Sequence, residues 1–552
     1  MVPTDTKRPQ KNPLMYQIVL FLWLCAILYF DPRILALTIG PENIAAKISV
    51  IIFTLLLNLF WFYAFYHLVI IVFSYFKNAN GKPVSCDMFS SATPSVALLY
   101  TTCNDFNENA ALSCLGQEYG NYHTFILDDS DNKEYRKKAD DFASLHASKV
   151  TVIRRPDRRG YKAGNLNYGM SRIRDYEYFS VSDADTILPS DYIEKLLPYF
   201  NSPDIAFVQS RQEFNQGQKP AFAQGLGYQI ELHCDHYLKT KEIYGFVMFY
   251  GHGALMRSDV LKEIGGFPEV ATEDLAYSML IRQKGYRGVY AHDVTCLEEF
   301  PSTFRQYRKR SDKWIKGTAE CLIKYYPSFF RNKDVSGVEK FDVFVSAASL
   351  LLGLPFVALL LMVGMVLPYF YYHFQFQGPM FKMPLSYNGT FLGVLAGISS
   401  NLFWRWDFFL MLLLTLAAPI LPAIHKAIRD PIGKFRFIVM YTFVFYATQV
   451  SSAFALISYL WSRKAEFPVT GDIGGKRAPD KAIIMTELLF TLAFLSISVI
   501  TRNVWFLSFA AGTFAGLLIL KLGFENRLVR ISAYIPIIIL AIVIMFIGKT
   551  LQ

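Results

Sequence analysis

Apolar and polar stretches alternate along the 552 residues of the chain and separate one polar region from several membrane-length segments. Residues 14–38 and 46–76 are each long and apolar enough to span a bilayer as a helix, which takes about 20 residues. Residues 80–335 carry most of the charged side chains. Further apolar segments follow at 341–373, 408–427, 435–461, 483–501, 504–522 and 532–549. The pattern predicts a polar domain inserted between transmembrane helices.

Within the polar region, short apolar runs alternate with amphipathic stretches. The expected strands are 96–101, 123–127, 150–153, 178–181 and 205–209, and the expected helices are 107–118, 132–145, 162–173 and 190–199. Such alternation is typical of an α/β fold, a mostly parallel sheet with helices on both faces. Ligands bind these sheets beyond the carboxyl ends of the strands, so functional side chains are expected there.

The composition is that of a membrane protein. Hydrophobic residues make up 53% of the chain and charged residues 18%, and the formal net charge is +10. The basic residues flank apolar segments and form no stripe with interleaved aromatic residues, so no nucleic-acid partner is expected. Lys7, Arg8 and Lys11 precede the first segment, which predicts a cytosolic amino terminus and, after two spans, a cytosolic polar domain. The cysteines form no C-x-x-C pair and are expected to be reduced.

Two acidic pairs lie at expected strand ends. Asp183 and Asp185 follow the strand 178–181, and Asp128 and Asp129 follow the strand 123–127. Carboxylates so close repel one another unless a cation lies between them, and hard divalent cations bridge protein carboxylates to a diphosphate. A D-x-D sequence alone also occurs in structural loops. The coincidence of two pairs at one sheet edge favours a nucleotide-diphosphate site.

Two helix starts add groups that such a site needs. Lys162 opens a helix beside Gly164, where free amides and an ammonium suit a diphosphate, although an ordinary glycine cap gives the same pattern. Glu273 and Asp274 open another helix, where the helix dipole favours acids regardless of catalysis. A turn precedes them that is able to project a carboxylate into a cleft, which makes Asp274 the candidate general base for a sugar hydroxyl.

A third cluster combines basic residues with an indole. Arg310 and Lys313 offer cations for a leaving diphosphate, and Trp314 offers a ring that stacks on a sugar face. The alternative is an amphipathic helix at the membrane surface that keeps its basic ends in water. The two interpretations are compatible.

Taken in order, these motifs resemble those of the membrane-embedded processive family 2 glycosyltransferases, the group that contains cellulose, hyaluronan, chitin and curdlan synthases. The motifs are Asp128-Asp129, Lys162-Ala-Gly-Asn-Leu-Asn167, Asp183-Ala-Asp185, Thr272-Glu-Asp274, Arg310-Ser-Asp-Lys313-Trp314 and Phe467-Pro-Val469-Thr470. The last one looks like the F-x-V-T gating loop of cellulose synthase and its near relatives. The resemblance implies a GT-A type nucleotide-sugar domain inserted in an α-helical transmembrane channel domain.

The resemblance also implies a role for each matching residue. Donor contacts would come from Asp128, Asp129, Lys162, Asp183, Arg310, Lys313, Phe467, Val469 and Thr470. Asp185 would bind the metal ion, with Mg²⁺ or Mn²⁺ as the implied cofactor. Asp274, with Glu273 beside it, would deprotonate the acceptor hydroxyl.

Acceptor contacts are implied as well. Trp314 would form the floor on which the acceptor sugar stacks, and His252, next to Gly251, is either an acceptor contact or a packed histidine. One departure concerns the usual Q-x-x-R-W motif, which here has Arg310 at the first position and Lys313 at the fourth. Lysine is a point charge where arginine is a bidentate fork, so the diphosphate contact differs from the usual one.

The expected organisation has four parts. They are two transmembrane helices (1–79), a cytosolic glycosyltransferase domain (80–300), amphipathic interface helices (301–340) and a transmembrane channel region (341–552). The loop 465–480 must share the cytosol with the domain, yet three apolar segments separate the two. One of them, 435–461, is therefore expected to lie along the membrane interface, which leaves about seven spans.

These expectations define a processive, inverting enzyme of the plasma membrane. Its expected partners are a UDP-sugar, with UDP-glucose as the expected donor, the growing polysaccharide and the lipid bilayer. The expected product is a (1,4)- or mixed (1,3;1,4)-β-glucan. The alternatives are another β-polysaccharide such as hyaluronan, curdlan or a capsular glucan, a non-processive lipid-phosphate glycosyltransferase, and a transporter or scaffold without catalysis. The sequence does not determine any partner for export through a further envelope.

Overall fold

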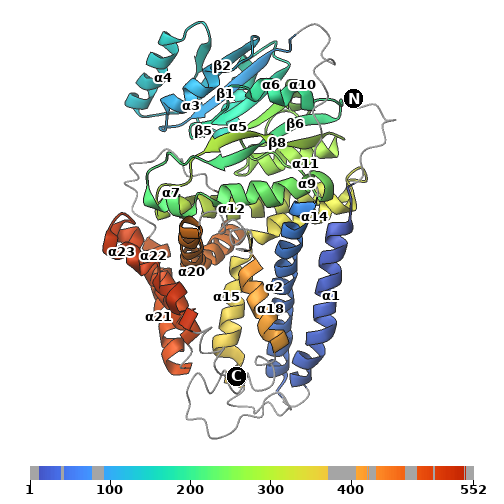
Figure 1. The fold of residues 1–552 in the computed structure, drawn as a ribbon, viewed down its shortest axis with the longest axis vertical. Helices are drawn as coiled ribbons and strands as arrows, with labels where there is room; N and C mark the ends of the chain where they lie inside the picture. The colour runs from blue at the N-terminus through green and yellow to red at the C-terminus, as the bar shows by residue number, and fades with distance from the viewer. Residues whose placement is uncertain are drawn as a thin grey trace.

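The computed structural model describes residues 11–38, 43–76, 93–367, 369–370, 406–418, 421, 431–465, 481–501, 504–539 and 541–542. An α/β domain lies at one end of the molecule and a set of long helices at the other, with further helices lying across between them (Figure 1). The long helices α1 (Leu14–Leu35), α2 (Ile44–Phe76), α15 (Gly353–Leu361) and α18 (Trp406–Ala417) run away from the domain. The hairpin of α21 (Lys481–Thr501) and α22 (Val504–Leu522) packs against α15, where Leu360 joins Phe494 and Phe509 in one apolar cluster.

The domain is built on one eight-stranded sheet with the order β3-β2-β1-β4-β7-β6-β8-β5. Its strands are β1 (Val96–Thr102), β2 (Tyr122–Asp128), β3 (Val150–Ile153), β4 (Tyr178–Asp183), β5 (Thr186–Ile187), β6 (Ile205–Phe214), β7 (Ala254–Arg257) and β8 (Arg287–Glu298). Strands β3, β2, β1 and β4 are mutually parallel, as are β6 and β8, whereas β7 and β5 run antiparallel to their neighbours. The predicted α/β fold and all five predicted strands are confirmed.

Both faces of the sheet are covered because apolar side chains occupy both sides of the central strands. In β1, Val96, Leu98 and Tyr100 join one core, whereas Ala97 and Leu99 join the other. The first core includes side chains of α3 (Glu108–Leu115), α4 (Lys133–Leu145) and α6 (Tyr192–Leu196). The second includes side chains of α5 (Tyr161–Arg172), α10 (Ser258–Glu263) and α11 (Glu273–Gln283). The helices predicted at 107–118, 132–145 and 162–173 are confirmed to within a few residues at each end.

Helix α14 (Gly337–Ser349) joins the domain to the long helices through two buried ion pairs. Glu339 accepts a 2.7 Å hydrogen bond from Arg282 of α11, and one turn later Asp342 pairs with Lys241 of α9 (Lys239–Tyr244). The chain then bends by 58° between α14 and the segment that begins with α15. The apolar run predicted as one segment from 341 therefore starts under the domain and only afterwards turns along α2.

Helix α20 (Pro431–Ser462) contacts the domain near both of its ends. Close to its start, Arg436 donates to the Gln224 carbonyl and the Lys434 ammonium lies 2.9 Å from the centre of the Tyr228 ring. Close to its end, Ala455 and Tyr459 join a cluster with Ile315 of α12 (Phe304–Lys324). A helix of this length measures about 48 Å, so it extends along the underside of the domain.

Three helices are long and apolar enough to cross a membrane, judged by length and composition: Leu14–Leu35, Ile44–Tyr75 and Pro431–Ser462. If α14 and the segment after it count as one bent span, there are up to four. Helices α21 and α22 contribute shorter apolar stretches, Ile484–Ile500 and Phe506–Leu522. These counts of spans concern the described residues alone. The expected total of about seven spans stays a prediction.

Asp342→Ala is expected to lower the free energy of unfolding by about 3–5 kcal/mol, because it leaves the Lys241 ammonium buried without its counter-ion. The side chains of Lys241 and Asp342 are 6% and 1% exposed. Thermal unfolding of the detergent-solubilised protein measures the effect. As a control, Asp259→Asn removes the partner of Arg257 in a pair whose carboxylate is 64% exposed, and it is expected to cost less than about 1 kcal/mol. Equal shifts for the two variants would contradict the expectation.

Candidate active site

The site begins where three parallel strands end side by side. The register of β1 places Thr102 opposite Asp128 of β2 and Thr101 opposite Asp183 of β4. The two acidic motifs therefore lie at the same sheet edge, on either side of β1. This juxtaposition was predicted from the sequence.

Two arginines hold the acids at the end of β2. Arg154 donates to Asp128 at 2.7 Å, and Arg155 donates to both oxygens of Asp129 at 2.8 and 2.6 Å. Asp128 is buried, and its other oxygen accepts from the backbone amide of Ser130. Sequence reasoning missed both arginines, although a pair of basic residues directly after the strand 150–153 was the signal for them.

Lys162 connects α5 to the end of β4. Its ammonium lies 2.5 Å from Asp183 and donates to the Gly251 carbonyl at 2.9 Å, while the Thr101 hydroxyl donates to Asp183 at 2.7 Å. Burial alone would raise the pKa of Asp183, but the Lys162 ammonium, together with His252 and the Thr101 hydroxyl, keeps that pKa below its ordinary value. Burial alone would likewise lower the pKa of Lys162, and the Asp183 and Glu273 carboxylates raise it instead.

Asp185 lies in a cluster of acids with too few cations. Burial raises its pKa well above the ordinary value, and the charges of Asp183, Glu298 and Asp105 raise it further. Glu298 ends β8 directly opposite Thr186 of β5, and sequence reasoning missed it. A carboxylate in this state is stabilised by a further cation, so the donor set suits a hard divalent ion.

The residues present fit such an ion only together with the ligand's own oxygens. Within the described ranges, no group of three or more His, Cys, Asp or Glu side chains is arranged to hold a metal ion. Mg²⁺-type sites commonly take one or two carboxylates from the protein and the rest from phosphates and water. Asp185 is the side chain placed to supply such a carboxylate ligand.

The loop before β7 passes over these groups with glycines in left-handed conformations. Gly251 has a φ of +87°, and a Cβ atom there would lie 3.6 Å from the Asp274 carboxylate and 3.9 Å from the Lys162 ammonium. Next to it, His252 Nδ1 lies 3.1 Å from the Thr186 hydroxyl and His252 Nε2 lies 3.7 Å from Glu298. The structure thus brings Gly251 and His252 to the acidic cluster, and their contact with an acceptor stays a prediction.

Asp274 lies in the first turn of α11, facing the same loop. Its Oδ1 accepts from the backbone amide of Leu275 at 2.8 Å. Burial raises the pKa of Asp274 to about 7, and the neighbouring Glu273 carboxylate adds to the shift. A carboxyl group with a pKa near neutrality exchanges protons at physiological pH, which is what general-base catalysis requires.

Helix α12 brings cations and an indole to the other side of the acids. The Arg310 guanidinium lies 4.5 Å from the centre of the Phe300 ring and 4.7 Å from that of Trp314. Burial lowers the pKa of Arg310 in spite of the charges of Glu298 and Asp185, and among the described residues its Nε has no hydrogen-bond partner. A buried guanidinium with an unused donor favours an anionic ligand.

Lys313 and Trp314 complete this side of the site. Burial lowers the pKa of Lys313, although the Glu273 and Asp274 carboxylates oppose the shift and so lie within its electrostatic reach. Trp314 is 41% exposed, with its ring beside the Arg310 guanidinium. The three residues of the predicted motif therefore lie together.

Three of the predicted donor contacts belong to the loop 465–480. Phe467, Val469 and Thr470 fall outside the described residues, so their contact with a nucleotide stays a prediction.

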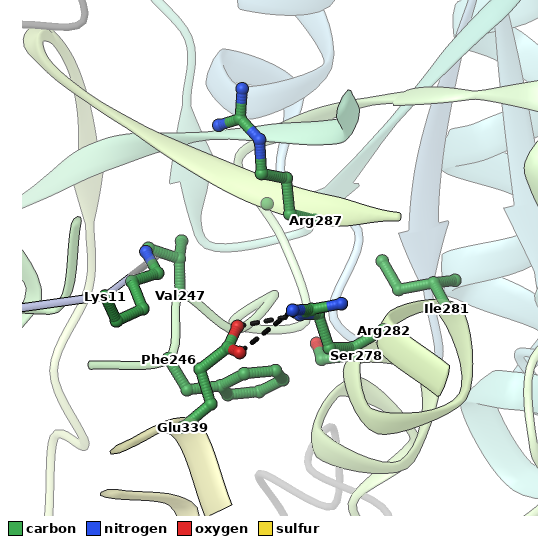
Figure 2. Close-up of a pocket in the computed structure, with 9 residues that line it drawn as sticks. Lys11, Phe246, Val247, Ser278, Ile281, Arg282, Arg287 and Glu339 are labelled. Atoms are coloured by element: carbon green, nitrogen blue, oxygen red, sulfur yellow. Dashed lines mark hydrogen bonds and ion pairs between the residues drawn. The ribbon is translucent and has the colours of Figure 1, made fainter. Parts of the chain in front are cut away.

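A pocket on the underside of the domain is lined by Lys11, Phe246, Val247, Ser278, Ile281, Arg282, Arg287, Gly288 and Glu339. Figure 2 shows it beside the Arg282–Glu339 ion pair. It contains none of the predicted site residues and belongs to the junction with α14.

Comparisons with known proteins agree with this geometry. The family described as "Glycosyltransferase like family 2" matches residues 110–317. This range runs from α3 to α12 and contains Asp183, Asp185, Asp274 and Arg310. These residues of the candidate site therefore lie within the part of the chain that is similar to this family.

Sequence relatives and solved structures resemble parts of the chain. The chain is 28% identical over 229 residues to a probable glucomannan 4-beta-mannosyltransferase 11 of Arabidopsis thaliana, over 40% of this chain and 52% of that protein. It is 30% identical over 203 residues to glucomannan 4-beta-mannosyltransferase 1 of Oryza sativa subsp. japonica, over 35% of this chain and 38% of that protein. The chain thus spans about half or less of these relatives. A structure of the mannosyltransferase PcManGT of Pyrobaculum calidifontis, in complex with GDP-Man and Mn²⁺, has a TM-score of 0.45, 16% identity and coverage of 76% of this chain and 100% of that one.

Arg310→Gln is expected to weaken the binding of a nucleoside diphosphate about ten- to a hundredfold, because a hydrogen bond to a charged group contributes about 1.5–3 kcal/mol. Isothermal titration of the purified protein with UDP and with GDP, each with Mn²⁺, measures the change. Lys309→Gln, which removes a neighbouring cation on the same helix, is the control and is expected to leave the affinity within about twofold. Equal losses in the two variants would mean that only the net charge of α12 matters.

Proposed function

We propose that this protein is a processive, inverting glycosyltransferase that extends a β-linked polysaccharide from a nucleotide-sugar donor. The observation that carries the proposal is the meeting of three kinds of group at one sheet edge. Asp183 and Asp185 come from β4 and the residues after it, Asp274 from α11, and Arg310 with Trp314 from α12. A donor diphosphate, a hydroxyl nucleophile and a sugar ring each find a matching group there.

The donor is held by cations already in place. Lys162 and Lys313 approach the carboxylates of Asp183 and Glu273, and Arg310 adds a buried guanidinium. Charge develops on the diphosphate as it leaves, and preorganised cations in a site with little water stabilise that charge strongly. Asp185 would hold a divalent cation, Mg²⁺ or Mn²⁺, and that cation would supply further neutralisation of the leaving group.

Asp274 acts as the general base. It takes the proton from the acceptor hydroxyl, whose oxygen then attacks the anomeric carbon as the bond to the diphosphate breaks. A single displacement inverts that carbon, so an α-linked donor gives a β-linkage. Trp314 stacks on the acceptor sugar, which orients the hydroxyl toward Asp274.

The sugar is a hexose, and the relatives favour mannose. The matched plant proteins carry the name glucomannan 4-beta-mannosyltransferase, whereas the resemblance in the motifs led to an expectation of UDP-glucose. A β-linked mannan or glucomannan is accordingly the first candidate product, and a β-glucan the second.

The long helices anchor the enzyme in a plasma membrane, with the α/β domain on the cytosolic side. Helix α20 lies along the membrane surface, since it contacts the domain near both ends. The predicted polymer channel belongs to the same proposal. Tyr441 and Gln449 are polar side chains in the otherwise apolar helix α20, and we propose them as lining residues of that channel.

Purified protein is expected to form an insoluble polymer when it is incubated with Mn²⁺ or Mg²⁺ and one donor at a time, GDP-mannose or UDP-glucose. Digestion of the product with a β-mannanase or with linkage-specific β-glucanases identifies the sugar and the linkage. Asp274→Asn is expected to lower turnover by about a hundredfold or more. A single sugar transferred to a lipid, or no product from either donor, would contradict the proposal.

The rate is expected to depend on pH through Asp274. The base acts only when deprotonated, so kcat/KM rises about tenfold per pH unit below the pKa of Asp274 and levels off above about 7. Glu273→Gln removes the like charge beside it, lowers the pKa of Asp274 and shifts the midpoint to lower pH. A pH–rate profile for both proteins measures the shift. Profiles with the same midpoint would exclude Asp274 as the titrating base.

A further inference from the structure

Helix α12 has two faces with different tasks. One face packs against the helices below the domain through Phe304, Arg308, Ile315 and Ala319, which follow one another at intervals of four, seven and four residues. The other face turns to the site and carries Arg310, Lys313, Trp314 and Gly317. Because an α-helix has 3.6 residues per turn, these two sets lie on roughly opposite sides. A rotation of α12 about its axis therefore moves the cations relative to the acids.

The packing face contains one ion pair to a membrane-type helix. Arg308 Nη1 donates to Glu487 Oε2 of α21 at 2.9 Å, and Arg308 Nη2 lies 2.7 Å from Glu487 Oε1. The two side chains are 13% and 4% exposed. Glu487 is the only acidic residue in α21, in an otherwise apolar sequence. A carboxylate in such a helix is costly unless paired, which makes its partner a candidate for function.

The other contacts of this face do not fix the rotation as well. Phe304 packs against Phe443, and Ile315 and Ala319 pack against α20, but apolar contacts have no preferred direction. The charge-assisted hydrogen bond from Arg308 to Glu487 has a defined direction. Two residues along the helix, Arg310 depends on that geometry for its place beside Trp314 and near Asp185.

We propose that Arg308 and Glu487 are positioning residues for glycosyl transfer: their ion pair sets the rotation of α12 and thereby places Arg310 and Lys313 against the acidic cluster. The inference rests on the proposed function. It assigns to a helix of the membrane region an effect on the chemical step, without contact with the substrate. Loss of the pair should affect kcat more than KM, because cations on a leaving group stabilise the transition state more than the bound donor.

The test compares Glu487→Gln, Arg308→Lys and the exchanged pair Arg308→Glu with Glu487→Arg. Glu487→Gln is expected to lower kcat about ten- to a hundredfold with KM changed less than about threefold, since small displacements of catalytic groups have effects of this size. Arg308→Lys keeps the positive charge but loses the planar guanidinium, and its kcat is expected to lie between those of the wild type and Glu487→Gln. The exchanged pair is expected to recover most of kcat.

Two measurements separate this role from a loss of stability and from a failure of the proposed function. Hydrogen–deuterium exchange in residues 304–324 is expected to rise in Glu487→Gln even without donor, so it does not depend on which reaction the protein catalyses. Asp204→Asn, which breaks the 2.8 Å pair with Arg287 away from α12, is the control and should lower thermal stability with kcat unchanged. The proposal is overturned if Glu487→Gln has the kcat of the wild type, or if the exchanged pair restores stability but not kcat. A wild type without any transferase activity would instead refute the proposed function.

Discussion

Acidic side chains crowded at one end of a sheet impose the main constraint on this molecule. Asp183, Asp185 and Glu298 lie close together in a region of low dielectric constant, where like charges repel strongly. The balance comes from Lys162 on α5 and from Arg310 and Lys313 on α12. Since α12 packs at the same time on the helices of the membrane region, the charge balance of the site ties the α/β domain to that region.

A close backbone approach between α12 and the start of α11 strengthens this connection. Gly317 of α12 lies so near α11 that a Cβ atom would come within 2.7 Å of the Thr272 side chain. Thr272 immediately precedes Glu273 and Asp274, so the helix with the cations and the segment with the base move together. The sulfur of Cys321 adds a contact to the Thr272 hydroxyl on the same face.

Local patterns predicted the framework well because they depend on local physics. Buried strands such as Val150–Ile153 are short apolar runs, and the motifs Asp183-Ala-Asp185 and Glu273-Asp274 occur where strands end and helices begin. Contacts across long stretches of sequence were not predictable in this way. Glu298 joins Asp185 only because β8 pairs with β5.

The ion pairs under the domain escaped prediction for a similar reason. Glu339 precedes the apolar segment predicted from residue 341 and Asp342 is the second residue of that segment, so both look like ordinary polar residues at the start of a helix. Their partners Arg282 and Lys241 lie in the domain, and only tertiary packing brings them together. The apolar pattern also treated α14 and α15 as one segment, since hydropathy does not register a bend.

The same two ion pairs have a consequence for biosynthesis. Lys241 and Arg282 leave the ribosome 101 and 57 residues before their partners Asp342 and Glu339. Until then the underside of the newly made domain carries two cations that are destined for burial and have no counter-ions. The domain therefore reaches its final state only after translation has produced α14.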